Sequence, residues 1–412
     1  MSSRMTLLLV LICVMPFALI GVHTTSAGSS SLTDKELLGK LLFFDASLST
    51  PTGVSCATCH GPAVGFTGPD SKINATTVVY PGAVHTRFGN RKPPSAAYAG
   101  DSPTLYFDSN EEAWVGGMFW DGRATGTTLG DPVAEQAQGP FLNPLEQNYA
   151  HAKQVCLAVR HASYAPRFEQ VWGPGSLDCV NDVDGTFERI ARSISAYEQS
   201  AEVNPFSSKF DYYLKGQIEL TGEEAKGLDL FRGEKAKCSA CHPSDVGPNG
   251  EPPLFTDFTY DNLGVPKNPD NPFYAMPRKW NPLGSHWIDL GLGGFLSQSH
   301  PADVAEPELG KVKVPTLRNV DLRPATEFVK AYGHNGYFKS LKAFVHFYNT
   351  RDVLPVCGED FHHPGVDCWP AAEYPPTVNH DELGNLGLTE AEEDAIVAFL
   401  KTLSDGYVLP SN

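Results

Sequence analysis

The sequence contains two short motifs of the same form, CATCH at residues 56–60 and CSACH at residues 238–242. In each motif two cysteines are separated by two residues and are followed directly by a histidine. Two thiols at this spacing can bond to the two vinyl groups along one edge of a haem, and the adjacent histidine then ligates the iron. A redox or zinc-binding pair of cysteines needs no histidine in the fifth position. The sequence therefore predicts two covalently bound c-type haems, held by Cys56, Cys59 and His60 and by Cys238, Cys241 and His242.

The residues ahead of the two motifs also repeat. A threonine followed three residues later by a glutamate is the capping box that begins a helix, and this pair occurs ahead of both motifs. We therefore expect a short amphipathic helix before each haem site. The matched residues are Leu32, Thr33, Glu36, Gly39, Leu42 and Phe43 in the first copy and Leu220, Thr221, Glu224, Gly227, Leu230 and Phe231 in the second.

Each copy closes with a segment of helical periodicity, residues 187–198 in the first and 389–403 in the second. Between these helices lie segments rich in glycine and proline, and no alternating strand pattern is present. We predict a mainly α fold with two cytochrome c-like haem domains and long ordered loops. The first domain covers residues 28–204, with a boundary near Asn204-Pro205, and the second covers residues 205–412. The predicted loops are residues 61–107, 121–148 and 243–326.

The N-terminus has the form of a secretory signal peptide. Arg4 precedes an apolar run over residues 5–22, and small residues follow at 25–27, which predicts cleavage after residue 27. The alternative is an uncleaved membrane anchor; no later segment is long and apolar enough to span a bilayer. The net charge of −17 argues against a nucleic acid or an anionic membrane as partner and favours a basic protein. We expect an exported protein, in the periplasm or at the cell surface.

Four of the nine cysteines lie outside the leader and the haem motifs. An even number of cysteines in an oxidising compartment indicates disulfides. Proximity in sequence favours the pairs Cys156–Cys179 and Cys357–Cys368, although four cysteines allow three connectivities and free thiols are the other alternative.

Together with these motifs, further segments make a family recognisable. The chain resembles the bacterial di-haem cytochrome c peroxidases, including the MauG-type relatives that mature methylamine dehydrogenase. The matching segments follow the order of the family over nearly the whole chain after the leader. They are FWDGRA at 119–124, EQAQGP at 135–140, NPLE at 143–146, GKLLFF at 39–44, GFT at 65–67, NRKPPS at 90–95, PTLRNV at 315–320 and YGHNG at 332–336.

The resemblance implies a role for each haem and for three residues near them. The haem on His60 is expected to react with peroxide, and the haem on His242 to receive electrons. Glu146 matches the acid–base carboxylate, Gln136 its neighbour in the pocket, and Trp120 the indole between the haems. A carboxylate above an open iron position can move a proton from one peroxide oxygen to the other. The ordinary alternatives are a surface glutamate, a glutamine on a helix face and a core tryptophan.

The resemblance also implies axial ligands on the far side of each iron. His85 matches a histidine that ligates the first iron at rest and leaves on activation, although a loop histidine is commonly a surface residue. Tyr348 matches the sixth ligand of the second haem, with His346 and Met276 as rivals. Many family peroxidases use methionine there, whereas the MauG type uses tyrosine. A phenolate favours the ferric state and lowers the potential, which places reductive activation in doubt.

Family members also hold a calcium ion between their domains. Asn90 is the nearest match to its asparagine ligand, and Lys92 aligns almost as well. The acidic segment DCVNDVD at 178–184 lacks the glycine and terminal glutamate of a calcium-binding hand, so we expect it to form solvated turns. A homodimer is a further expectation from the family.

Three functions follow from these residues. The first is a di-haem peroxidase that reduces hydrogen peroxide with electrons from a small cytochrome c or copper protein. The second is a MauG-like enzyme that uses peroxide to oxidise residues of a partner protein. The third is a non-catalytic electron-transfer cytochrome, against which the pocket of Gln136 and Glu146 argues because a carrier needs no distal acid.

Overall fold

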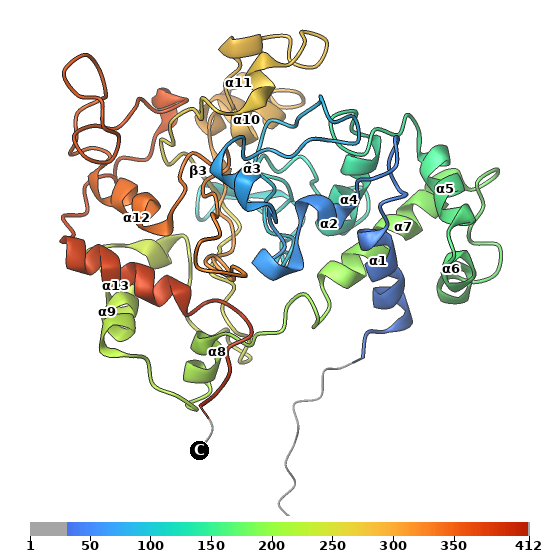
Figure 1. Ribbon diagram of the computed structural model, residues 1–412, viewed down its shortest axis with the longest axis horizontal. Helices are drawn as coiled ribbons and strands as arrows, with labels where there is room; N and C mark the ends of the chain where they lie inside the picture. Colours follow the sequence, from blue (N-terminus) through green and yellow to red (C-terminus); the bar gives the residue numbers. More distant parts are fainter. Residues whose placement is uncertain (1–30, 411–412) are drawn as a thin grey trace, which may run out of the picture. The chain divides into compact units, whose positions relative to one another are not determined.

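A computed structural model describes residues 31–410, and the chain in this range is mainly helical with few strands, as the sequence predicts (Figure 1). The predicted signal peptide, residues 1–27, lies outside the described residues. Among the residues that the structure describes, no helix is both long and apolar enough to cross a membrane. The α-helices are α1 (Asp34–Phe44), α2 (Cys56–Cys59), α3 (Ser71–Ala75), α4 (Pro132–Leu142), α5 (Ala152–His161), α6 (Ala165–Trp172), α7 (Val183–Glu198), α8 (Lys209–Leu214), α9 (Gly222–Arg232), α10 (Gly291–Leu296), α11 (Ala302–Ala305), α12 (Leu341–Thr350) and α13 (Glu390–Lys401).

The remaining regular structure is short. Two antiparallel strand pairs are present in the described chain, β1 (Tyr106–Asp108) with β2 (Ala113–Val115) and β3 (Tyr260–Asp261) with β4 (Val312–Lys313). Strands of two or three residues leave too little alternation for a pattern to be visible in the sequence. The 3-10 turns are η1 (Pro62–Val64), η2 (Cys238–Ala240), η3 (Pro272–Ala275), η4 (Gly284–His286), η5 (Glu306–Glu308) and η6 (Pro375–Thr377).

We refer to residues 32–204 as the N-terminal half and to residues 205–410 as the C-terminal half. In the N-terminal half, the Thr33–Glu36 capping box begins α1, and α1 packs against α7 (Figure 1). A Cβ atom at Gly39 would lie 1.8 Å from the carbonyl oxygen of Ser193, so only glycine allows this approach of the two helices. Phe43, Phe66 and Tyr197 then meet edge to face beside the crossing.

The C-terminal half repeats this construction. The Thr221–Glu224 capping box begins α9, and α9 packs against α13 (Figure 1). A Cβ atom at Gly227 would lie 1.9 Å from the carbonyl oxygen of Ala395. The rings of Phe231, Phe255 and Phe399 lie together beside this crossing, with centroids 5.1 to 6.2 Å apart. The repeat in the sequence is therefore a repeat of a helix pair that crosses at a glycine.

Each half has its own principal hydrophobic core. One core gathers buried side chains between Leu38 and Val203, and the other gathers those between Phe210 and Leu403. The change from one core to the other falls near the predicted boundary at Asn204-Pro205, and the division into two domains stays a prediction.

The expectation of three long loops is wrong in part: α4 lies within residues 121–148, α3 within residues 61–107, and α10 and α11 within residues 243–326. Asp131 caps α4 by accepting from the backbone N–H of Ala134, and Pro132 follows at the first helical position. Glycines ahead of this start and Pro140 inside the helix hide the helical pattern. The helix predicted at residues 187–198 also begins earlier, at Val183.

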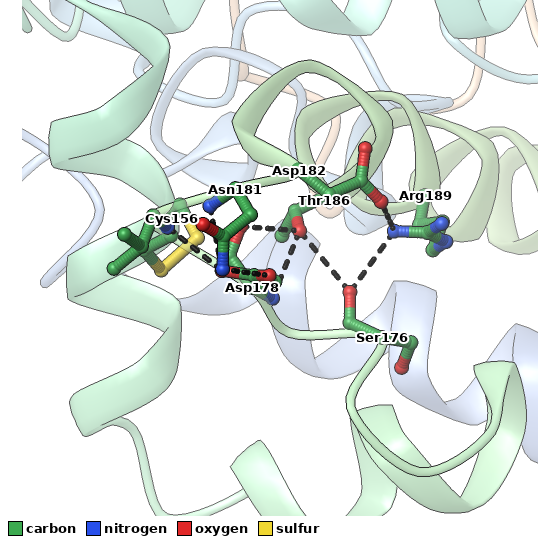
Figure 2. The surroundings of a disulfide bond; sticks show 9 residues. Cys156, Ser176, Asp178, Asn181, Asp182, Thr186 and Arg189 are labelled. Atoms are coloured by element: carbon green, nitrogen blue, oxygen red, sulfur yellow. Dashed lines mark hydrogen bonds and ion pairs between the residues drawn. A yellow bond between two sulfur atoms is a disulfide. The ribbon is translucent and has the colours of Figure 1, made fainter.

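Both predicted disulfides are present, Cys156–Cys179 and Cys357–Cys368. Figure 2 shows the turn beside the first of them. Asp178 accepts hydrogen bonds from the backbone N–H groups of Val180 and Asn181 and from the side-chain amide of Asn181. Residues 178–181 of the acidic segment are therefore held as a turn by their own hydrogen bonds, and residues 183–184 begin α7.

Candidate functional site: two histidine-bearing cavities

The first haem motif forms α2, and its histidine is oriented by a backbone carbonyl. His60 Nδ1 lies 3.1 Å from the carbonyl oxygen of Phe66, which accepts its hydrogen bond and leaves Nε2 free to ligate a metal. Burial lowers the pKa of His60, which favours the neutral imidazole that a metal requires. Phe66 has φ of 54°, a left-handed conformation that a bulky residue rarely adopts.

The second motif is arranged in the same way. His242 Nδ1 lies 2.7 Å from the carbonyl oxygen of Phe255, and burial lowers the pKa of this histidine as well. Phe255 also has a left-handed backbone, with φ of 55°. The same unusual conformation therefore presents the carbonyl to each histidine. Sequence reasoning missed both phenylalanines, because no glycine marks their positive φ.

Each motif opens onto a cavity. A cavity of about 140 Å³ adjoins Cys56, Cys59 and His60, and one of about 210 Å³ adjoins Cys238, Cys241 and His242. We call the first the His60 cavity and the second the His242 cavity. Both are lined mainly by apolar side chains, as a large hydrophobic cofactor requires.

Three lysines line these cavities, and none has a carboxylate within ion-pair distance among the described residues: the buried Lys330 and the half-buried Lys92 and Lys313. Lys330 donates to the carbonyl oxygens of Val64, Asn319 and Leu322, and Lys92 to Thr67 Oγ1. Burial lowers the pKa of Lys92 to about 8 and that of Lys313 to about 7. A buried cation without a counter-charge is costly, and the two carboxylates of a haem can supply that charge. The two cavities therefore fit two c-type haems.

The structure brings Glu146 and Gln136 into the His60 cavity. Gln136 lies on α4, and Glu146 lies in the turn that follows this helix. Asn143 closes the turn, because its carbonyl oxygen accepts from the N–H of Glu146 at 3.0 Å and its side chain accepts from Leu145. Burial raises the pKa of Glu146, and the nearby Arg123 opposes this shift. A carboxyl group with a raised pKa therefore faces the same cavity as His60.

Trp120 lines both cavities. Its indole Nε1 donates to the carbonyl oxygen of Lys92 at 2.8 Å, and its own carbonyl oxygen accepts from the N–H of Lys313. The ring of His334 meets it edge to face, with centroids 6.4 Å apart. The indole is 7% exposed, so it lies between the two cavities and away from solvent.

An ion-pair network fixes the segment that follows Trp120. Arg123 pairs with Asp121 at 2.8 Å, which agrees with a structural role for these two residues. Arg91 pairs with Asp121 and also with Asp289 of the C-terminal half, both at 2.6 Å. Arg91 holds the pKa of Asp289 well below its usual range, although burial acts in the opposite direction. The pairing of Arg91 with Asp289 joins the two halves and has no local signature in the sequence.

Of the three candidates for a sixth ligand at the second haem, Tyr348 lines the His242 cavity. It lies on α12, no hydrogen bond to its hydroxyl is formed among the described residues, and burial raises its pKa. His346 instead pairs through Nδ1 with Glu393 at 2.8 Å. Met276 is buried after η3 and does not line the cavity.

Two further predicted residues are His85, a proposed ligand of the first haem, and Asn90, a proposed calcium ligand. His85 is exposed and lines neither cavity. Asn90 lies at the His60 cavity, and its backbone carbonyl accepts from the side chain of Asn271. In the part of the chain that the structure describes, the one cluster of metal-ligating side chains is Cys241, Asp261 and Glu382, which includes a haem-motif cysteine. The distal role of His85 and the calcium site of Asn90 stay predictions.

Comparison with known proteins gives a consistent result. A family model described as di-haem cytochrome c peroxidase matches residues 33–219. The chain is 33% identical over 401 residues to the methylamine utilization protein MauG of Paracoccus denitrificans, covering 96% of this chain and 95% of that protein. It is 30% identical over 290 residues to a cytochrome c551 peroxidase of Nitrosomonas europaea, covering 70% and 66%.

Among solved structures, the chain is similar to the diheme peroxidase BthA of Burkholderia thailandensis. The TM-score is 0.73 at 31% identity, and the match covers 90% of this chain and 86% of that one. Agreement of sequence over nearly the full length, of fold and of two haem-attachment motifs gives one conclusion: the chain belongs to the di-haem cytochrome c peroxidase family, which includes MauG.

Proposed function

We propose that this protein reduces hydrogen peroxide to water at the haem held by Cys56, Cys59 and His60. One observation carries the proposal: Glu146 and Gln136 face the cavity that also contains these three residues. The bound haem supplies the iron at which the oxygen–oxygen bond is cleaved and from which electrons are drawn. The overall reaction is H₂O₂ + 2 H⁺ + 2 e⁻ → 2 H₂O.

Glu146 is the group that moves the proton. As a carboxylate it takes the proton from one peroxide oxygen, and as a carboxylic acid it returns that proton to the leaving oxygen. Its raised pKa brings these two states closer in free energy at neutral pH. The side-chain amide of Gln136 can donate to one peroxide oxygen and accept from the other, which orients the substrate.

Trp120 is the electron route between the two cavities. It lines both, and its hydrogen bond to the carbonyl of Lys92 fixes the ring. With a haem bound in each cavity, electrons would enter on the side of His242 and would reach the side of His60 by way of Trp120. The donor is a small exported cytochrome c or copper protein, and the net charge of −17 favours a donor with a basic surface.

A second function is favoured by Tyr348. A phenolate ligand stabilises the ferric state of the His242 haem and makes that haem difficult to reduce beforehand. The exposed position of His85 also favours a first haem that reacts without prior activation. In this function the two haems, when bound, would supply the oxidising equivalents of peroxide to residues of a docked protein, as in the MauG type.

One experiment tests the proposal and separates the two functions. One equivalent of hydrogen peroxide is added to the di-ferric holoprotein, and both ferric EPR signals are followed in the natural protein and in Glu146→Gln. We expect a reaction in the natural protein that is about 10²–10⁴-fold slower in the variant. Loss of both signals without prior reduction favours the MauG-like function, whereas a reaction that begins only after one electron is added favours the reductively activated peroxidase. Equal rates in the two proteins contradict the role of Glu146.

A further inference from the structure

A closed turn at residues 81–88 lies directly against the loop that carries Glu146. Pro81 and Phe88 form an antiparallel bridge, and the N–H of Gly82 donates to the carbonyl oxygen of Arg87. The N–H of Ala83 donates to the carbonyl oxygen of Glu146 at 2.7 Å. A Cβ atom at Gly82 would lie 2.2 Å from the carbonyl oxygen of Leu145, so the two backbones are in contact.

Arg87 forms hydrogen bonds with one residue before Glu146 in the sequence and one residue after it. Its guanidinium Nη1 donates to the carbonyl oxygen of Pro144 at 3.2 Å and to the side-chain oxygen of Asn148 at 2.8 Å. Asn148 in turn donates through its side chain to the carbonyl oxygen of Thr50. The residues two before and two after Glu146 are therefore fixed by one side chain, and no carboxylate pairs with that side chain among the described residues.

An aromatic ring of the C-terminal half packs against the guanidinium of Arg87. The guanidinium of Arg87 lies over the indole of Trp280, 4.6 Å from its centroid. Trp280 belongs to a loop that Asn281 orders, because the buried Asn281 side chain donates to the carbonyl oxygens of Phe273 and Gly284. A guanidinium over an aromatic face is held by cation–π attraction.

From these contacts we infer that Arg87 is a positioning residue for Glu146, and that Trp280 holds Arg87 in place. The inference rests on the proposed role of Glu146 as acid–base group. Proton transfer between two peroxide oxygens requires the carboxyl group to stay within hydrogen-bond reach of both, and a displacement of about 1 Å can lower the rate about a hundredfold. Arg87 bonds the backbone carbonyl of Pro144 before Glu146 and the side chain of Asn148 after it, and Trp280 connects Arg87 to the C-terminal half.

The test is a double-mutant cycle in the holoprotein, made from Arg87→Gln and Glu146→Gln. The readouts are the second-order rate constant for hydrogen peroxide and the association rate of cyanide, which must lose its proton to a distal base before it binds iron. We expect Arg87→Gln to lower both rates about tenfold to a hundredfold in the natural background. In the Glu146→Gln background Arg87→Gln should add no further loss, since there is no longer a carboxylate to position.

Variants at Trp280 test the same inference without substituting Arg87, so a local disturbance of the fold by Arg87→Gln does not affect them. Trp280→Leu should lower the rates about twofold to fivefold, and Trp280→Phe should recover most of this loss because an aromatic face remains. Lys279→Met is the control, since the Lys279 ammonium lies 4.4 Å from the centroid of the same ring but forms no hydrogen bond or ion pair with the Glu146 loop among the described residues. Haem content and the thermal unfolding midpoint are measured for each variant.

Three results overturn the inference. If Arg87→Gln lowers the rates by the same factor in both backgrounds, its effect does not pass through Glu146. If Glu146→Gln slows the reaction while Arg87→Gln and Trp280→Leu do not, Glu146 acts without positioning by Arg87 and Trp280. The inference then fails and the proposed function stands. If Glu146→Gln itself leaves both rates unchanged, the proposed function fails together with the inference.

Discussion

In the N-terminal half α1 crosses α7 at Gly39, and in the C-terminal half α9 crosses α13 at Gly227. Each half also contains a haem-motif histidine whose Nδ1 donates to the backbone carbonyl oxygen of a phenylalanine. Both phenylalanines have a left-handed backbone conformation. The surroundings of the two histidines then differ. The His60 cavity receives a glutamate from a turn, and the His242 cavity receives a tyrosine from a helix. The shared part has the motif that attaches a c-type haem, and we propose that the added segments give the two haems different roles.

The largest expected effect comes from removing the carboxylate that distinguishes the His60 cavity. Glu146→Gln should lower the peroxide rate constant about 10²–10⁴-fold with unchanged haem content, because the amide cannot accept a proton. In the natural protein the rate should fall as the pH is lowered through the raised pKa of Glu146, since protonation removes the base. The measurement is stopped-flow absorbance against pH. Glu188→Gln, a surface glutamate paired with Arg192, is the control, and an equal loss there would contradict the assignment.

The next effect tests whether the two helix crossings are equivalent. Gly39→Ala and Gly227→Ala each place a methyl group where a backbone carbonyl lies, and overpacking of this kind costs about 1–3 kcal/mol. We expect similar decreases in the free energy of unfolding, each with loss of haem in its own half. Denaturant unfolding and haem content measure this. Gly222→Ala at the start of α9, where a Cβ atom meets nothing within 4 Å, is the control.

If one glycine variant is much more damaging than the other, the two halves do not share one construction. Similar losses of stability, with loss of the haem on the same side as the mutation, would instead support the two-domain division that the sequence predicts.

A smaller effect is expected at the residue that distinguishes the His242 cavity. Tyr348→Phe removes the hydroxyl that can ligate iron, so the reduction potential of the His242 haem should rise and its ferric EPR signal should change. The His60 haem should keep its signal. His346→Gln and Met276→Leu are matched controls for the rival ligands, and neither should alter the spectrum. A change with His346→Gln but not with Tyr348→Phe would show that the tyrosine is not the ligand.

The sequence predicts the part of this structure that depends on local patterns. The capping boxes at Thr33 and Thr221 and both disulfides are present where it places them. Glu146, Gln136 and Trp120 are named through motif resemblance, and all three face a cavity beside a haem motif. A match to a family motif identifies which residues of the chain correspond to site residues. It does not show which other residues they contact.

The remainder depends on contacts between distant residues. Arg91 meets Asp289, Arg87 meets Trp280, and Lys330 meets the carbonyl oxygen of Val64, each across more than a hundred residues. No periodicity or spacing records such pairs. Each of these pairs joins the N-terminal half to the C-terminal half, so the contacts that hold the two halves together are the part that the sequence alone does not reveal.

The smallest expected effect concerns His85, the residue for which motif resemblance and position in the structure point in different directions. Resemblance makes it a resting ligand of the His60 haem, yet its side chain is exposed and the turn that carries it is tied by Arg87 and Ala83 to the Glu146 loop. Moving His85 to the iron would require those contacts to break. We therefore expect His85→Ala to leave the ferric EPR spectrum and the peroxide rate unchanged, with stability altered by about 0.5 kcal/mol or less, as for an ordinary surface residue. A resting protein in which His85→Ala converts a low-spin signal to a high-spin one would show instead that the turn opens, and the exposed His85 would then mark the activated conformation of a gated site.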